Sequence, residues 1–278
     1  MDNALSDDGS LLRLGIFAAI LLGLGAAETL YPRRERTLPR RARWFTNTAL
    51  IAIDTALLRL LLPVLALGMA ALAEQRGWGL FNAIAWPDWV EFALSVVLLD
   101  MAIYWQHVAT HRVPILWRLH KVHHVDRDLD VTSGFRFHPL EIIGSMIWKL
   151  ALVAALGAPV AAVFVFELLL NAGSMFSHAN IRLPLRLDEV LRLVLVTPDM
   201  HRIHHSVIRR ETDSNFGFST SLWDRLFGTY REEPEKGHRG ITIGLESFQD
   251  ERPQSLWQSL LIPFRSDTPK RTERTRSS

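Results

Sequence analysis

Long apolar blocks are the feature that most limits what this 278-residue chain can fold into. Residues 11–30 are almost continuously apolar, and about 20 such residues in a helix span roughly 30 Å, the thickness of a hydrocarbon core. Further blocks occupy residues 45–73, 89–104 and 140–178. Inside a bilayer the backbone must satisfy its own hydrogen bonds, which favours helices. The pattern predicts an all-α integral membrane protein with about four transmembrane helices.

Two of these blocks need a closer reading. The first follows an acidic segment and precedes no clear cleavage site, so we expect a retained membrane helix rather than a signal peptide. The last block is too long for one span and contains Gly157-Ala158-Pro159 near its middle. Because proline interrupts a helix interior, we expect a hairpin of two helices at 140–156 and 159–178.

Histidines form the second strong pattern. Ten of the eleven lie between residues 107 and 205, and eight of them form an H-x3-H and two H-x2-HH boxes. Residues i, i+3 and i+4 share one face of a helix, so each box can direct several imidazoles to one point. Imidazole is a common ligand of transition metals, and eight exceed what one tetrahedral ion needs. The boxes predict two neighbouring metal ions, held by His107, His111, His120, His123, His124, His201, His204 and His205.

The remaining histidines are single. His138 and His178 lie between the boxes, where the simpler alternative is a hydrogen-bonded polar residue in a loop or at a helix end. His238 follows a glycine in a charged segment and is expected at the surface.

Charge distribution predicts the orientation. The segment 32–44 carries six arginines, whereas 74–88 carries only Arg76. The positive-inside rule places the first segment in the cytoplasm, and counting spans then brings all three boxes to the cytoplasmic side. We therefore expect a cytoplasmic helical cap that holds the metal site. The segment 183–196 has the apolar spacing of a helix lying at the lipid headgroups.

Composition excludes several classes of protein. The chain has no cysteine, so disulfides, thiolate metal sites and Cys-ligated iron–sulfur clusters are excluded. Net charge is only +2, and the clustered basic residues favour contact with anionic lipids over nucleic acid. The H-x3-H reads HVATH, without the glutamate of the zincin motif. The boxes also lack the carboxylate ligands of soluble di-iron bundles.

Together, HVATH, HKVHH and HRIHH on a chain of paired apolar helices resemble the fatty acid hydroxylase/sterol desaturase superfamily of integral-membrane di-iron oxygenases. TSGFRFHPLE at 132–141, FSHANI at 176–181 and NFGFSTSLWDRLFGTY at 215–230 extend the resemblance, which covers roughly residues 90–264. It implies that the eight box histidines ligate metal, and that His138 and His178 are further ligands or neighbours of ligands. Because each of these two lies where an apolar block meets the cap, we predict that both bind metal directly.

The resemblance also implies an activity. We expect two non-haem iron ions, O2 as cosubstrate, and hydroxylation or desaturation of a membrane lipid such as a fatty acyl chain or a sterol. No catalytic residue beyond the ligands and no organic cofactor site is expected. Electrons would come from a separate cytochrome b5-like protein, ferredoxin or reductase, because the sequence has neither a Rossmann fingerprint nor a cysteine cluster. The boxes do not distinguish hydroxylation from desaturation, since both begin with hydrogen abstraction.

Three divisions of the chain follow. Residues 1–88 hold the first transmembrane helices and the basic loop, 89–264 the histidine-box domain, and 265–278 a polar tail expected to be disordered. The alternatives are a carotenoid-type hydroxylase and a non-catalytic metal-binding or metal-transporting membrane protein. We expect a solvated acidic loop at Asp126, Asp128 and Asp130, although their carboxylates could instead accept hydrogen bonds from metal-binding imidazoles. Asp199, two residues before His201, is the better candidate for that second role.

Overall fold

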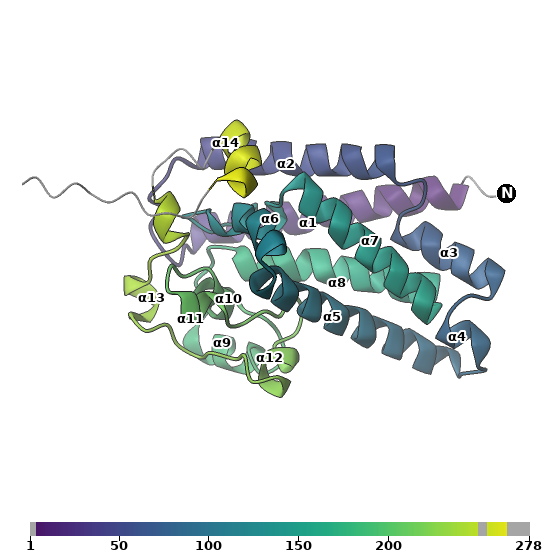
Figure 1. Cartoon of the computed structure of the whole chain (residues 1–278). Helices are drawn as coiled ribbons and strands as arrows, with labels where there is room; N and C mark the ends of the chain where they lie inside the picture. Colours follow the sequence, from purple (N-terminus) through teal and green to yellow (C-terminus); the bar gives the residue numbers. More distant parts are fainter. Residues whose placement is uncertain (1–3, 250–254, 266–278) are drawn as a thin grey trace, which may run out of the picture.

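A computed structural model describes residues 4–249 and 255–265 (Figure 1), so the predicted tail at 266–278 lies outside the described residues. Across these ranges the regular structure is helical, and β-pairing is confined to isolated bridges. The long helices are α1 (Ala4–Leu30), α2 (Arg40–Leu61), α3 (Ala66–Arg76), α5 (Asp88–Arg112), α7 (Pro139–Leu156) and α8 (Val160–His178). The predicted all-α class is confirmed.

Five segments are long and apolar enough to cross a membrane: Leu11–Leu30, Arg40–Ala83, Asp88–Arg112, Pro139–Leu156 and Val160–His178. The sequence led us to expect about four. The expected hairpin contributes two of the five, since both of its helices are long enough to span the bilayer. The outer faces of these segments suit hydrocarbon, because large side chains such as Leu22 of α1 and Leu60 of α2 are 72% and 79% exposed.

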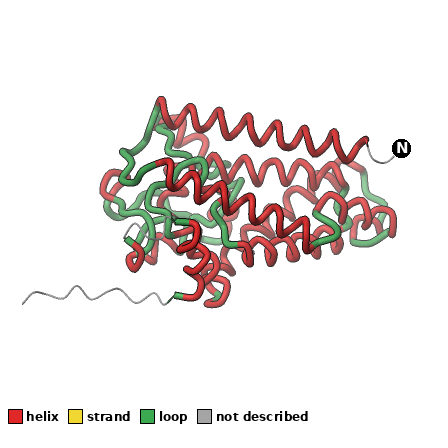
Figure 2. Tube along the Cα trace, turned by 90° about the horizontal axis from the view of Figure 1, so that it is seen from above, coloured by secondary structure: helices red, strands yellow, loops and turns green. Residues whose placement is uncertain are grey.

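The long helices run roughly side by side in one elongated bundle (Figures 1 and 2). α8 packs against α5 and α1, while α7 packs against α2 and α3. A core of small and branched side chains, including Ala70, Leu99, Val153 and Val163, joins α3, α5, α7 and α8. The N-terminal helices therefore pack directly on the histidine-bearing part of the chain.

The predicted break between α7 and α8 is a tight turn. Gly157 ends α7 with a left-handed φ of 66°, a conformation that glycine adopts without steric cost. A Cβ at this position would lie 2.4 Å from the carbonyl oxygen of Trp78, so the turn also packs closely against the loop after α3. Pro159 then forms the N-cap of α8.

Short helices form a cap at one end of the bundle (Figure 1). They are α6 (Pro114–His124), α9 (Leu185–Leu191), α10 (Pro198–His204), α11 (Arg209–Thr212), α12 (Leu222–Leu226), α13 (Gly237–Gly240) and α14 (Leu256–Leu261). α9 falls in the segment expected at the headgroups, and its Leu185 and Val190 are 73% and 64% exposed. The opposite end of the bundle carries α3 and α4 (Leu80–Ala83).

A buried ion network fixes the loop after α6. Arg43 of α2 contacts Asp126 at 2.7 Å and Asp130 at 2.6 Å, and all three side chains are fully buried. Asp128 accepts hydrogen bonds from the backbone of Thr37 and Leu38. The expectation of a solvated acidic loop was therefore wrong, because arginine and backbone donors far away in the sequence cover these carboxylates.

Candidate metal centre

Nine of the ten histidines singled out in the sequence meet in two adjoining groups. Within each group the potential ligand nitrogens lie within 4.8 Å of one another, and every side chain is buried. The first group is His107, His111, His120, His124 and His204; the second is His123, His178, His201 and His205.

Helix geometry divides the boxes between the groups. α5 supplies both of its histidines to the first group. On α6, His120 and His124 point to the first group and His123 to the second; around α10, His204 belongs to the first and His201 and His205 to the second. Each H-x2-HH box thus serves both groups. The His124 and His205 rings stack with centroids 4.5 Å apart, which brings the two groups into contact.

Ring nitrogens of the first group lack hydrogen-bond partners. These are the Nε2 atoms of His107, His111, His120 and His204 and both nitrogens of His124. Leaving a buried polar atom unpaired costs about 1–3 kcal/mol. Five unpaired imidazoles facing one point therefore indicate a missing common partner, and a metal ion is the partner that such nitrogens accept.

Ring nitrogens of the second group converge on His178. Its Nε2 lies 3.0 Å from Nε2 of His123, 3.1 Å from that of His201 and 3.2 Å from that of His205. One ring nitrogen holds at most one proton, so hydrogen bonds cannot satisfy all four atoms at once. A cation bound among the four nitrogens would satisfy all of them.

Backbone carbonyls orient four of the nine rings, those of His107, His123, His178 and His204, through the other nitrogen. The Nδ1 atom of His107 contacts the Phe216 oxygen at 2.7 Å, and that of His204 contacts the Ser214 oxygen at 2.8 Å. His178 makes the same contact with Ser174, four residues earlier on α8, at 2.7 Å. Donation from Nδ1–H leaves the lone pair on Nε2, the atom that faces the centre.

Two carboxylates also contact the rings, and sequence reasoning missed both. Glu141 in the first turn of α7 accepts from Nδ1 of His120 at 2.6 Å, and Asp213 lies 3.3 Å from Nδ1 of His111. A carboxylate in the first turn of a mostly apolar helix is a signal that could have identified Glu141. Asp213 carries no comparable signal, because its contact depends on how the cap folds over α5.

Burial keeps the cap imidazoles neutral. It lowers the pKa of His204 to about 3, and burial together with neighbouring imidazoles lowers the pKa of His201 and His205 well below the usual value. Neutral imidazole is the form that ligates metal. These side chains are therefore ready to bind metal at physiological pH.

His138 lies outside both groups. Its Nδ1 accepts from the backbone N–H of Leu140 as the N-cap of α7, and its Nε2 lies 3.3 Å from the Leu260 oxygen. Pro139 follows as the first residue of the helix, a position that proline favours. His138 thus has local partners for both nitrogens, whereas His178 joins the second group.

Asp199 and His238 also differ from expectation. Asp199 forms ion pairs with Arg33 and Arg202, which hold the pKa of its carboxyl below the usual value although burial alone would raise it. It therefore ties the arginine-rich loop to α10 instead of orienting a ring of the centre. His238 was expected at the surface, yet its side chain is only 10% exposed and lies beside Glu233.

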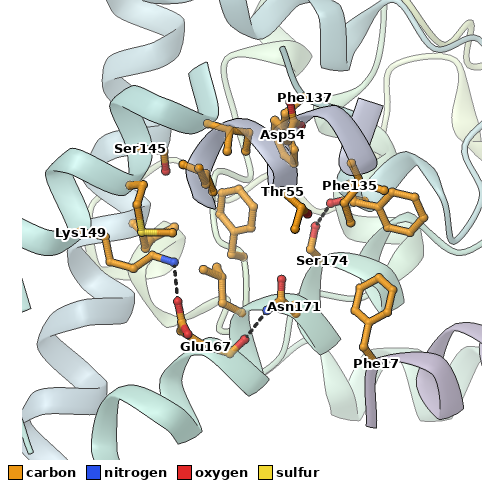
Figure 3. Close-up of a pocket in the computed structure, with 18 of the residues that line it drawn as sticks. Phe17, Asp54, Thr55, Phe135, Phe137, Ser145, Lys149, Glu167, Asn171 and Ser174 are labelled. Atoms are coloured by element: carbon orange, nitrogen blue, oxygen red, sulfur yellow. Dashed lines mark hydrogen bonds and ion pairs between the residues drawn. The ribbon is translucent and has the colours of Figure 1, made fainter. Parts of the chain in front are cut away.

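A cavity of about 520 Å³ opens beside the first group (Figure 3). His107 and His120 line it, and residues from α1, α2, α5, α7 and α8, together with Phe135, Phe137 and Phe218, form most of its remaining walls. Apolar side chains such as Phe17, Leu58, Met146 and Phe164 predominate among them. The centre thus faces a largely apolar chamber between membrane-spanning helices.

These features define a class: an integral membrane protein with a buried centre of nine histidines beside an apolar cavity. Residues 92–229 match the fatty acid hydroxylase family model. The chain belongs to the fatty acid hydroxylase/sterol desaturase superfamily.

Relatives of known name support the assignment. The chain is 30% identical over 188 residues to alkylglycerol monooxygenase of Homo sapiens, which covers 66% of this chain and 41% of that protein. It is 28% identical over 158 residues to ornithine lipid hydroxylase OlsE of Rhizobium tropici, covering 57% and 47%. It is 28% identical over 178 residues to a probable Delta(7)-sterol 5(6)-desaturase of Neurospora crassa, covering 58% and 45%. The matches thus span less than half of these relatives, and no solved structure matches the chain.

Proposed function

We propose that this protein is an O2-dependent oxidoreductase that hydroxylates or desaturates a membrane lipid at a centre of two non-haem iron ions. The observation that carries the proposal is the pair of histidine groups beside a membrane-embedded apolar cavity. The named relatives act on alkylglycerols, ornithine lipids and sterols, which supports a lipid as the substrate class.

Nine histidines form the proposed ligand set: the five of the first group and the four of the second. An all-imidazole donor set suits iron, which changes oxidation state and activates O2, whereas zinc does not. The iron pair, when bound, would supply the oxidising power needed to break an unactivated C–H bond. His138 is left out of this set because both of its ring nitrogens are engaged elsewhere.

The residues of the chain position the reactants. The apolar walls of the cavity hold a hydrocarbon chain and keep water out, while His107 and His120 bring the centre to its edge. Glu141 holds the proton of His120 at Nδ1 and so keeps Nε2 free for metal. A separate donor, of cytochrome b5, ferredoxin or reductase type, delivers electrons from the cap side.

Mass spectrometry of lipid extracts tests this function. Cells that express the protein are expected to contain a lipid with one additional oxygen atom or two fewer hydrogen atoms, and cells expressing His204→Ala are expected to lack it. Either mass change identifies the reaction type. Identical lipid extracts, together with a purified protein that binds zinc and consumes no O2, would instead favour a non-catalytic metal-binding protein.

We also propose that the cap faces the cytoplasm, because the six arginines of residues 32–44 lie at its end of the bundle. Single cysteines are informative because the native chain has none. Glu35→Cys and Lys236→Cys are expected to react with an impermeant maleimide only after the cells are opened, whereas Gln75→Cys is expected to react in intact cells. Labelling of Lys236→Cys in intact cells would show that the cap lies on the outer side of the membrane.

A further inference from the structure

Three acceptor oxygens line the cavity without a hydrogen-bond partner. They are Oδ1 of Asp54, Oε1 of Gln106 and Oε2 of Glu141, and each belongs to a side chain on a membrane-spanning helix. Asp54 is only 5% exposed. Ionisable residues inside a membrane are costly and usually functional, so an unpaired buried aspartate at this position calls for a ligand.

These acceptors lie at the metal end of the cavity. Gln106 immediately precedes His107. The other oxygen of Glu141, Oε1, contacts Nδ1 of His120 at 2.6 Å. Asp54 is close enough to Glu141 to interact with it electrostatically. A group bound by these three side chains therefore lies beside the first histidine group.

The positively charged side chains that line the cavity form no hydrogen bonds with these three acceptors. Lys149 contacts Glu167 at 3.0 Å (Figure 3). Arg13 contacts the same carboxylate at 2.6 Å. Lys149 lies eight residues after Glu141 on α7, about 12 Å farther along the helix axis. Lys149 and Arg13 thus share Glu167 as their partner, and Arg59, the third cation that lines the cavity, forms no hydrogen bond with the three acceptors either. The acceptors near the metal therefore need a donor from outside the described part of the chain.

We propose that Asp54, Gln106 and Glu141 bind a hydrogen-bond donor of the lipid substrate, a hydroxyl or an amino group that lies close to the carbon to be oxidised. The inference rests on the proposed function, because it names the class of lipid that the cavity admits. The ligand must donate because the unpaired atoms of Gln106 and Glu141 are an amide oxygen and a carboxylate oxygen, which accept hydrogen bonds. A lipid that presents only hydrocarbon or an ether oxygen would leave them unpaired.

Binding without turnover tests this directly. Iron-loaded protein in detergent, kept free of O2, would be titrated with 1-hexadecanol, hexadecylamine and hexadecyl methyl ether by equilibrium dialysis of labelled ligand. The alcohol and the amine are expected to bind at least about tenfold more tightly than the ether, because a site with buried hydrogen-bonding groups rejects an analogue that leaves them unpaired. Equal affinity of all three would overturn the proposal and show that water alone meets these acceptors.

Variants of Asp54 sharpen the result. Asp54→Leu is expected to bring the three affinities within about twofold of one another, since the central acceptor is gone. Asp54→Asn keeps an acceptor oxygen without the charge, so it is expected to retain the preference for the alcohol and weaken binding of the amine. This second variant decides the matter if Asp54→Leu does not fold. Unchanged preferences in both variants would contradict the proposal.

Glu74→Gln serves as the matched control, because this exposed carboxylate on α3 does not line the cavity and its loss is expected to leave all affinities unchanged. Iron content and O2 consumption, measured separately, report on the proposed function. A protein that turns over lipid yet binds the ether as well as the alcohol would refute only the recognition of a donor.

Discussion

Replacing His204 by alanine is expected to remove most of the bound metal and to abolish lipid oxidation. His204 lies in the first group, and its Nε2 is buried without a partner. Loss of a partner that merely orients a ligand already lowers metal affinity about 10–100-fold, so loss of a ligand is expected to cost more. Metal content of the purified variant, measured by inductively coupled plasma mass spectrometry, checks the prediction.

Two other histidines provide controls. His138→Ala and His238→Ala are expected to keep the full metal content, because neither residue belongs to the two groups. His178→Ala, in contrast, is expected to lose metal like His204→Ala. Full metal retention in His178→Ala, or metal loss in His138→Ala, would show that the proposed ligand set is wrong.

Replacing Arg43 by leucine is expected to lower the free energy of unfolding by about 3–5 kcal/mol, the usual cost of leaving a buried charge without its partner. The variant would strand two carboxylates, Asp126 and Asp130, which are fully buried against the guanidinium. Unfolding in detergent, followed by circular dichroism at increasing denaturant, measures the change.

Arg41→Leu is the matched control, because Arg41 lies two residues away and is exposed. Its substitution is expected to change the free energy of unfolding by less than about 0.5 kcal/mol. Equal stability of the two variants would mean that the Arg43 network contributes no more than a surface ion pair.

Local patterns in the sequence predicted much of this architecture. The apolar blocks have the length of membrane spans, and Gly157 and Pro159 mark the turn between α7 and α8. The histidine spacings predicted a shared centre because i, i+3 and i+4 positions depend only on helix geometry. The sequence did not show that each H-x2-HH box serves both groups, since this depends on the angle at which α6 and α10 approach one another.

Contacts between distant segments could not be predicted in the same way. Asp126 and Asp130 look solvated in the sequence, but Arg43, more than 80 residues earlier, buries them. His138 looks like His178 in isolation, yet Pro139 starts a helix that His138 caps, whereas His178 ends a helix directed at the centre. In both cases the partner, and not the residue itself, determines the role.

Counting the metal ions bound per chain tests the central claim most directly. Protein purified without chelators from iron-supplemented cells is expected to contain two iron ions per chain, one for each histidine group. A single zinc ion per chain would contradict the account, because it would leave one group of buried imidazoles unpaired and provide no metal able to activate O2.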